Sequence, residues 1–491
     1  MLTKSDFIKY IQCPKYLWLY KHRKDLLSAE VDYNLQKVFD MGYEVEAQAY
    51  KLFPGGVNAQ VEGFNESIAK TKQLMAQKTP IIFQPTISGR ELFCRADIIK
   101  LSDDGQSWDI YEVKSATTVK DLNIHDLAFQ KICFESNGHQ IGQLHLICVN
   151  NQYVRHGDID PEQLLQIENV SIQVQALEAD IKAEMEVALK TSKKTVEPVT
   201  RILKQCREPY ACVFLDYCWK DIPDHSIYEI AGGLSEEKLN HLIDEGILEI
   251  KDIPDGVITS PAGLRQHHAV KHNEVHIEPE SIAEELMQLQ YPLYFLDYET
   301  FAPGVPLFDG YRPYQRMTFQ YSLHVQDAPG GEVKHFSYLA SGWADPSLGL
   351  AKDLSKKIGD TGSVIAWNMS FEKGCNSEMA DRYPKFASFF ESLNERMFDL
   401  MQVFKKGFYV HKDFHGSASL KKVLPVMVPE LSYGDLDIGE GGTASNKWRD
   451  MIDPETSKDE AKEIYDSLLS YCELDTLAMV QILEELKKLI N

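Results

Sequence analysis

Residues 91–116, ELFCRADIIKLSDDGQSWDIYEVKSA, form the pattern that most restricts how this chain can fold. Two runs of alternating apolar residues flank Asp104-Gly105, a dipeptide typical of tight hairpin turns. A turn centred there pairs Asp97 with Glu112 across the two strands. Because side chains alternate between the faces of a strand, Lys114 is expected on the same face.

This arrangement predicts a metal site with a lysine beside it. Carboxylates paired across a sheet lie roughly 5 Å apart, and a buried pair is tolerated only with a cation between its members. Carboxylates that hold Mg²⁺ on a phosphate, beside an ammonium group, suit phosphodiester hydrolysis. The alternative is an exposed hairpin whose Asp, Glu and Lys side chains are solvated.

The same residues resemble the RecB-like branch of the PD-(D/E)XK nucleases, with Asp97 as the isolated acid and Glu112 to Lys114 as the E-x-K element. In that family an upstream helix carries a metal-binding His, and here MGYEVEAQA has Glu46 at that place. The family's Q-x-x-x-Y element reads Gln130 to Phe134. The resemblance implies a restriction-endonuclease-like domain in which Lys114 is catalytic and Glu46, Asp97 and Glu112 bind metal.

Four of the nine cysteines form a second candidate site. Cys206, Cys212 and Cys218 are separated by five residues each, and Cys13 precedes a proline near the N-terminus. Zinc sites usually contain closer C-x₂₋₄-C pairs, whereas iron–sulfur clusters accept more varied spacing. Zinc ligation and small buried hydrophobic side chains are the alternatives.

This layout is similar to the iron–sulfur RecB-like nucleases, which include the CRISPR-associated exonucleases and the AddB-type repair subunits. The resemblance implies that Cys13, Cys206, Cys212 and Cys218 hold a [4Fe-4S] cluster. For the cysteines in apolar runs or alone, we expect the role of a buried hydrophobe. These are Cys94, Cys133, Cys148 and Cys375.

A third group of candidate residues lies in the last 200 residues. In YPLYFLDYET, alternation puts Asp297 and Glu299 on one face near the end of a strand. In the last helix, Tyr471 and Asp475 are one turn apart, and Asp475 interrupts an apolar stretch, where a buried carboxylate needs a partner. The alternatives are an exposed strand end and ordinary packing of the tyrosine.

D-x-E on a strand and Y-x-x-x-D on the last helix resemble the tyrosine-bearing DEDD exonucleases of the RNase H-like fold. Their middle motif N-x-x-F-D reads Asn368 to Glu372 here, with Glu in place of Asp. The resemblance implies that two divalent metals are bound and that the tyrosine positions the attacking water. The implied ligands are Asp297, Glu299, Glu372 and Asp475, and the tyrosine is Tyr471.

Two neighbouring features accompany this motif set. Asp399 matches a recurrent Asp of these exonucleases that is not expected to be a ligand. A segment at a predicted helix start could contact phosphates, or it could be a plain capped surface helix. Its polar residues are Ser417, Ser419, Lys421 and Lys422.

A chain of 491 residues is expected to form two or three domains. Strand and helix patterns predict an α/β protein. We expect a PD-(D/E)XK domain with an iron–sulfur cluster over residues 1–220, a helical connector over 221–290, and an RNase H-like DEDD exonuclease domain over 291–491.

Composition restricts the class of protein further. No apolar run approaches the roughly 18 residues that span a bilayer, and the N-terminus lacks the apolar core of a signal peptide, so we expect a cytoplasmic protein without a membrane partner. The formal net charge of -23 excludes a broadly basic nucleic-acid coat. Binding would then rely on a partner protein or on local cations. The candidates are Lys15, Lys21, Arg23 and Lys24.

Taken together, the sequence predicts a nuclease with two active sites, dependent on Mg²⁺ or Mn²⁺, that acts on DNA in repair, recombination or defence against foreign DNA. It resembles bacterial proteins that fuse these two nuclease domains. One alternative is a nucleic-acid-binding or scaffolding protein in which Glu46 and Glu372 mark degenerate sites. The other is an RNA exonuclease, since DEDD folds serve both polymers.

Overall fold

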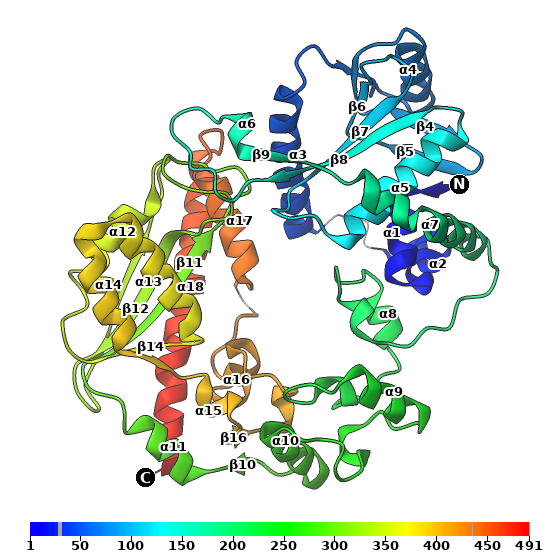
Figure 1. Cartoon of the computed structure of the whole chain (residues 1–491). Helices are drawn as coiled ribbons and strands as arrows, with labels where there is room; N and C mark the ends of the chain where they lie inside the picture. Colours follow the sequence, from blue (N-terminus) through cyan, green and yellow to red (C-terminus); the bar gives the residue numbers. More distant parts are fainter. Residues whose placement is uncertain (28–31, 435, 491) are drawn as a thin grey trace. The chain divides into compact units, whose positions relative to one another are not determined.

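The chain folds into a mixed α/β structure with several sheets, as expected (Figure 1). The computed structural model describes residues 1–27, 32–434 and 436–490. The chain divides into two compact units, and each combines two stretches of sequence. The first unit is Met1–Asp221 with Pro303–Gln315, and the second is Ile222–Ala302 with Arg316–Asn491.

A six-stranded sheet organises the first unit, in the order β2-β3-β6-β7-β8-β9. Its strands are β2 (Val57–Asn58), β3 (Ile81–Phe83), β6 (Ile98–Leu101), β7 (Trp108–Lys114), β8 (Ile141–Val149) and β9 (Leu165–Asn169). Strands β6 and β7 are antiparallel and pair Ile98 with Tyr111, which confirms the register predicted for the hairpin. Strand β8 is parallel to β7 and is reached through helix α5 (Asp121–Ser136), because parallel strands need a crossover connection.

The remaining elements of the first unit surround this sheet. They are β1 (Leu2–Thr3), α1 (Lys4–Gln12), α2 (Pro14–His22), α3 (Tyr33–Lys51), α4 (Phe64–Ala76), β4 (Thr86–Gly89), β5 (Leu92–Arg95), α6 (Pro161–Leu164), α7 (Ser171–Ser192) and α8 (Leu215–Trp219). Helix α1 begins with a capping box between Thr3 and Asp6, which satisfies two of its free backbone amides. Phe7 of α1 stacks on Phe129 of α5, with ring centroids 5.5 Å apart. The N-terminal helix is therefore anchored in the core of this unit.

Residues 303–315 belong to the first unit, although the sequence analysis assigned them to the C-terminal domain. Val305 is buried in a cluster with Ile98 and Ile147. The Arg155 guanidinium donates to the carbonyls of Pro306 and Leu307, at 2.9 and 2.6 Å. The segment thus contributes an apolar side chain and two carbonyl groups to the first unit, which explains its placement there.

A five-stranded sheet organises the second unit, in the order β13-β12-β11-β14-β15. Its strands are β11 (Leu293–Phe301), β12 (Met317–Gln326), β13 (Val333–Leu339), β14 (Ser363–Ala366) and β15 (Met397–Asp399). The first three are antiparallel neighbours, whereas β14 and β15 run parallel to β11. The three strands predicted after residue 291 are therefore confirmed, and β11 lies at the centre of the sheet.

Helices cover both faces of this sheet. They are α12 (Pro346–Leu354), α13 (Met369–Arg382), α14 (Ala387–Glu395), α15 (Gln402–Lys405), α16 (Leu420–Met427), α17 (Gly441–Met451) and α18 (Lys458–Ile490). On one face Phe295 packs in a cluster with Leu483 of α18, and on the other Leu296 packs with Leu350 of α12. Because successive residues of β11 point to opposite faces, this strand contributes to both cores.

The predicted connector consists of short helical units and belongs to the second unit. Its main helices are α9 (Glu236–Asp244), α10 (Pro261–His272) and α11 (Pro279–Leu286), and strand β10 (His276–Ile277) pairs with β16 (Tyr409–Val410). A small core of its own contains Ile227, Leu242 and Ile250. Among the described residues, no helix combines the length and apolar character needed to cross a membrane.

Candidate active sites

Glu112 is the centre of the candidate site in the first unit. It lies on β7 and is buried. Its Oε1 atom accepts hydrogen bonds from the ammonium groups of Lys4, at 2.6 Å, and Lys114, at 2.7 Å. Its Oε2 atom accepts from the Gln130 amide at 2.7 Å. The hairpin is thus part of a buried polar network, and the alternative of a solvated hairpin does not describe it.

Two members of this network, Asp126 and Lys4, were not predicted from the sequence. Asp126 of α5 accepts from Lys114 at 2.6 Å and lies 3.5 Å from the Lys4 ammonium. Burial favours the protonated acid, but the two lysines outweigh it and hold the pKa of Asp126 below its usual range. Although burial opposes it, the carboxylates of Asp126 and Glu112 raise the pKa of Lys4. Asp126 is one helical turn before Gln130, and this spacing is the signal that could have found it.

Asp97 lies beside this network, and among the described residues no ammonium or guanidinium group forms an ion pair with it, although the charges of Lys4 and Lys114 act on it. Its Oδ2 atom accepts from the backbone amide of Val113 at 2.7 Å. Burial and the nearby Glu112 carboxylate raise the pKa of Asp97 to about 8, and the charge of Glu46 acts in the same direction. Glu46 accepts from the Tyr50 hydroxyl and the Gln84 amide. The charges of Glu112 and Glu46 both act on Asp97, but among the described residues these three acids do not form a group with oxygens within 4.8 Å of one another.

Three carboxylates converge in the second unit. Asp297 and Glu299 lie on β11 and Asp475 lies on α18, and one oxygen of each falls within 4.8 Å of the others. Burial and the neighbouring carboxylates raise the pKa of Asp297 and of Glu299 well above the usual value. Burial also raises the pKa of Asp475, to about 6. Such a group of acids is a natural site for divalent cations.

Glu372 lies in the first turn of α13 and is not part of the group of three acids whose oxygens fall within 4.8 Å of one another. It is buried, and no described residue offers a hydrogen bond to its Oε2 atom. Burial and the Asp399 carboxylate raise the pKa of Glu372 to about 8, and its charge also raises the pKa of Asp297. An unpaired buried carboxylate oxygen is costly without a cation, so Glu372 fits a metal ligand.

Asp399 has a different environment, although it is also buried. Its Oδ1 atom accepts from the backbone amides of Asn368 and Met401, at 3.1 and 3.2 Å. Its Oδ2 atom accepts from the Gln402 amide at 3.0 Å. Both oxygens therefore accept hydrogen bonds, and the bond from Asn368 holds the residue that precedes α13. The expectation that Asp399 is not a ligand stays a prediction.

Aromatic and cationic side chains border the acids of the second unit. The Tyr433 hydroxyl donates to Asp475, and its ring lies 6.2 Å from that of Tyr471. The Lys421 ammonium lies 5.5 Å from the Tyr471 ring centroid, and its charge opposes the rise in the pKa of Asp475. Cys472 donates from its Sγ to Asp297 at 3.4 Å. Tyr433 was missed because it stands in an irregular segment, and Cys472 because a cysteine on the buried face of α18 reads as ordinary packing.

The four grouped cysteines line one cavity of about 90 Å³. Cys13 joins α1 to α2, and the other three lie in residues 206–218. The Gln12 amide donates to the carbonyls of Gln205 and Tyr210, at 2.8 and 2.7 Å, which fastens the two segments together. Burial raises the pKa of the Cys212 thiol to about 11. The structure thus brings together thiols that are nearly 200 residues apart.

The spacing of these thiols restricts what they can bind. Among the described residues, no three of the four sulfurs lie within 4.8 Å of one another. A tetrahedral zinc site with Zn–S bonds of about 2.3 Å would bring its sulfurs to roughly 3.8 Å. A cluster is larger than a single ion, so the cavity suits a cluster better. The cysteines expected to be buried hydrophobes are buried: Cys94, Cys133, Cys148 and Cys375.

The N-terminal cations do not form the free basic patch that the sequence suggested. Lys15 pairs with Glu197 at 2.6 Å, Lys21 with Asp6 at 2.5 Å and Arg23 with Asp25 at 2.7 Å. Opposite charges at these distances reduce the attraction that each cation can exert on a phosphate. Of the four cations proposed, three are therefore already paired.

Residues 294–419 match a family described as a domain of unknown function, DUF2779. No curated protein matches the chain. The matched stretch begins within β11 and includes Asp297, Glu299 and Glu372, but it ends before Tyr471 and Asp475.

Proposed function

We propose that this chain is a metal-dependent nuclease with two active sites, a 3′–5′ exonuclease centre in the second unit and a RecB-like nuclease centre in the first. One observation carries the proposal: the carboxylates of Asp297, Glu299 and Asp475 converge within 4.8 Å. Among the described residues, no lysine or arginine forms an ion pair with any of them. Acids held together in this way call for divalent cations.

In the second unit, Asp297, Glu299, Glu372 and Asp475 would hold two divalent ions. Bound there, Mg²⁺ or Mn²⁺ would activate water and stabilise charge on the scissile phosphate. The Tyr433 hydroxyl orients Asp475, and Tyr471 presents its hydroxyl beside the acids to position water. Lys421 supplies positive charge for a phosphate. The mixed sheet with β11 at its centre follows the element order that the resemblance to DEDD exonucleases implies.

In the first unit, Glu46, Asp97 and Glu112 would hold one divalent ion. The raised pKa of Asp97 supports this assignment, because it reflects burial of the carboxyl next to the charges of Glu112 and Glu46. Lys114 would orient water or stabilise charge on the phosphate, and Asp126 and Gln130 keep its ammonium aligned with Glu112. Lys4 competes with a metal for Glu112, so this centre is expected to need a higher metal concentration than the other.

The cysteine cavity fits a [4Fe-4S] cluster held by Cys13, Cys206, Cys212 and Cys218. The wide separation of the sulfurs supports a cluster rather than a single zinc ion. Such a cluster would join α1 to the segment after α7, two parts of the first unit that are far apart in the chain. Its contribution is expected to be structural, since closing a long loop restricts the unfolded chain.

Incubation with nucleic acids labelled at one end tests this function. Single- and double-stranded DNA and RNA are incubated with Mn²⁺ and the wild type, Asp297→Asn, Glu112→Gln or the double variant. Asp297→Asn should abolish 3′ trimming and spare the products of the first centre, and Glu112→Gln should do the reverse. Asp381→Asn, an exposed acid of α13, is the matched control. Full 3′ trimming by the double variant would refute the assignment.

The same experiment separates the alternatives. A scaffolding protein with degenerate sites would cleave none of the four polymers and would bind no Mn²⁺ that depends on these acids. An RNA exonuclease would trim RNA and leave DNA intact, which would correct the substrate but keep the second centre. DNA is the expected substrate, on the basis of the resemblance to RecB-like nucleases.

A further inference from the structure

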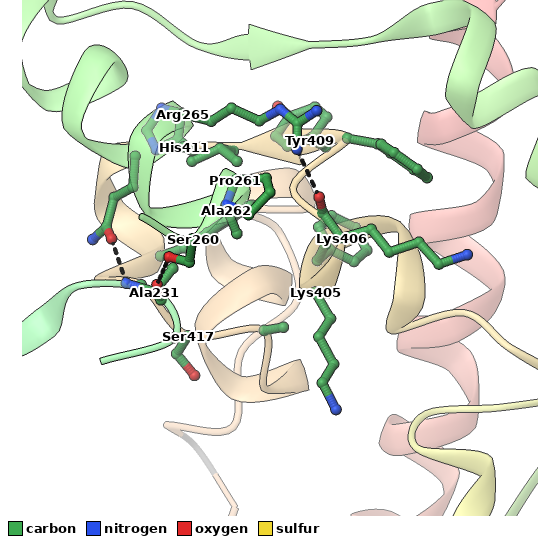
Figure 2. A pocket seen from close by; sticks show the side chains of 18 of the residues that line it. Ala231, Ser260, Pro261, Ala262, Arg265, Lys405, Lys406, Tyr409, His411 and Ser417 are labelled. Atoms are coloured by element: carbon green, nitrogen blue, oxygen red, sulfur yellow. Dashed lines mark hydrogen bonds between the residues drawn. The ribbon is translucent and has the colours of Figure 1, made fainter. Parts of the chain in front are cut away.

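A large pocket in the second unit is not used by either proposed centre. Its volume is about 890 Å³, within the range typical of ligand sites. Helix α10 forms one wall, and residues 401–419 form the other (Figure 2). Ser260 caps α10 and donates from its hydroxyl to the Ala231 carbonyl at 2.8 Å, and Arg265 donates to the Lys406 carbonyl at 2.9 Å. These bonds join the two walls to neighbouring segments and hold the pocket in shape.

Aromatic rings dominate the apolar part of the lining. Phe404, Tyr409 and Phe414 lie with centroids 5.8 to 6.0 Å apart, so they form one continuous cluster. Phe408 and Tyr409 are partly exposed, although both are large and mainly apolar. Aromatic faces of this kind are suited to stacking with a planar ring.

Positive charge lies at the edge of the same pocket. Lys405 is exposed, and among the described residues no carboxylate lies within ion-pair distance of its ammonium. Arg265 also lines the pocket, but its guanidinium is paired with Glu278 at 2.6 Å. In Figure 2 the Lys405 and Lys406 side chains extend in different directions, and Lys406 pairs with Glu285. Lys405 is therefore the cation best placed to meet an anionic ligand.

The walls of the pocket continue into the acidic centre of the second unit. Met401 lines the pocket, and its amide donates to Asp399, whose charge acts on Glu372. On the other side, the Ala418 carbonyl accepts from Trp367 at 3.0 Å. Ser419, also in the lining, is followed two residues later by Lys421 beside Tyr471. Residues 399–421 therefore contribute both to the lining of the pocket and to the surroundings of the acids.

We propose that this pocket binds one nucleotide of a single-stranded nucleic acid, upstream of the 3′ end that is being trimmed. The base would stack on the rings of Phe408 and Tyr409, and the adjacent phosphate would face Lys405. Aromatic rings beside a cation match the known physical basis of single-strand binding. A purely apolar peptide would gain nothing from the lysine. The proposal deepens the exonuclease function and depends on it.

Steady-state trimming by the full-length protein tests this with two substrates, a dinucleotide and a single-stranded 12-mer. Phe408→Ala and Lys405→Met should each raise KM for the 12-mer by about tenfold. The first removes a ring on which a base would stack, and the second removes the cation that would face a phosphate. The kcat value and the kinetics on the dinucleotide should stay within about twofold of wild type. Lys356→Met, an exposed lysine in the same unit, is the matched control.

Salt dependence adds a second readout. Lys405→Met should reduce the slope of log affinity for the 12-mer against log salt by about 0.7, the loss of one phosphate contact on a single strand. Phe408→Ala should leave this slope unchanged while weakening binding. These affinities are measured on Asp297→Asn without metal, so that they do not require catalysis.

The possible outcomes are distinct. Unchanged KM for the 12-mer in both variants, with active wild type, would overturn the pocket proposal and leave the exonuclease intact. Equal losses on the 12-mer and the dinucleotide would show a general defect of the unit and would also overturn it. Wild type that trims no polymer would refute the exonuclease itself. Displacement of a hydrophobic dye by a fatty acid, but not by the 12-mer, would assign the pocket to an apolar ligand instead.

Discussion

The Lys4 ammonium lies 2.6 Å from the Glu112 carboxylate, although 108 residues separate the two in the chain. Lys4 is the first residue of α1, whose Phe7 is anchored in the core. The position of the ammonium is therefore set by packing. Together with Lys114, it pairs with Glu112 and Asp126, whereas among the described residues Asp97 has no ion pair.

Lys4→Met is expected to destabilise the metal-free first unit by about 2 kcal/mol, since it removes one of two cations from a buried cluster of acids. Mn²⁺ should recover part of this loss, and its affinity for the first centre should rise, because a divalent ion can replace the missing charge. Thermal unfolding with and without Mn²⁺ measures both effects. Lys72→Met, an exposed lysine on α4, should change neither.

Asp297→Asn is expected to stabilise the metal-free second unit by about 1 kcal/mol, because it relieves repulsion among buried carboxylates. It should also abolish the increase in melting temperature that Mn²⁺ gives the wild type. Calorimetry on protein stripped of metal provides the measurement. A melting temperature that falls without metal, or an undiminished response to Mn²⁺, would contradict the assignment of Asp297 as a ligand.

Cys13→Ser is expected to remove most of the iron from protein purified without oxygen. The wild type should be brown and contain about four iron atoms per chain, since four thiolates match a [4Fe-4S] cluster. The first unit should become sensitive to protease, while the second, with its own core, stays folded. Cys148→Ala, a buried cysteine of β8, should keep its iron. Stoichiometric zinc in place of iron would exclude the cluster.

His324 is expected to lower the stability of the second unit as the pH falls from 6.5 to 4, whereas the buried acids with raised pKa values act in the opposite direction. Burial, with a smaller effect from His335, lowers the pKa of His324 to about 4. The unfolded chain, with a pKa near 6.5, therefore binds a proton in this range that the folded unit does not. The stabilisation that comes from neutral His324 is complete above pH 6.5. It amounts to about 1 to 3 kcal/mol and is lost as the pH falls.

Thermal unfolding across this pH range, with wild type and His324→Gln, measures the effect. The glutamine can keep a hydrogen bond to Thr476, which lies 2.8 Å from the His324 ring, but it does not titrate. The variant should therefore become more stable relative to wild type as the pH falls from 6.5 to 4. His268→Gln, an exposed residue of α10, should behave as wild type. Identical slopes for wild type and His324→Gln would exclude His324 as the source.

Local patterns predicted the elements that carry the acids. The Asp104-Gly105 turn set the register of the hairpin, because a two-residue period leaves few other ways to bury its apolar side chains. Alternation of side chains predicted the strand that carries Glu299, and helical periodicity predicted the last helix. The association of Cys13 with Cys206 was expected only from a resemblance, because no local pattern links them.

Other parts of the sites could not be predicted, because they depend on contacts between distant segments. Lys4 reads as an ordinary surface lysine of an amphipathic helix, and its ion pair with Glu112 depends on how α1 packs on α5. Tyr433 stands in an irregular segment and reaches Asp475 only in the folded chain. Likewise, neither α10 nor residues 401–419 alone has a sequence pattern that predicts the large apolar pocket between them.

The placement of residues 303–315 in the first unit has a consequence for how the protein can be produced or cut into parts. The two units are joined by three peptide connections, after residues 221, 302 and 315, so a protease that cuts one of them leaves both units attached. During synthesis, Val305 and Tyr314 emerge only after β11 has left the ribosome. A gene fragment that ends at residue 221 therefore encodes every proposed ligand of the first unit without its complete core.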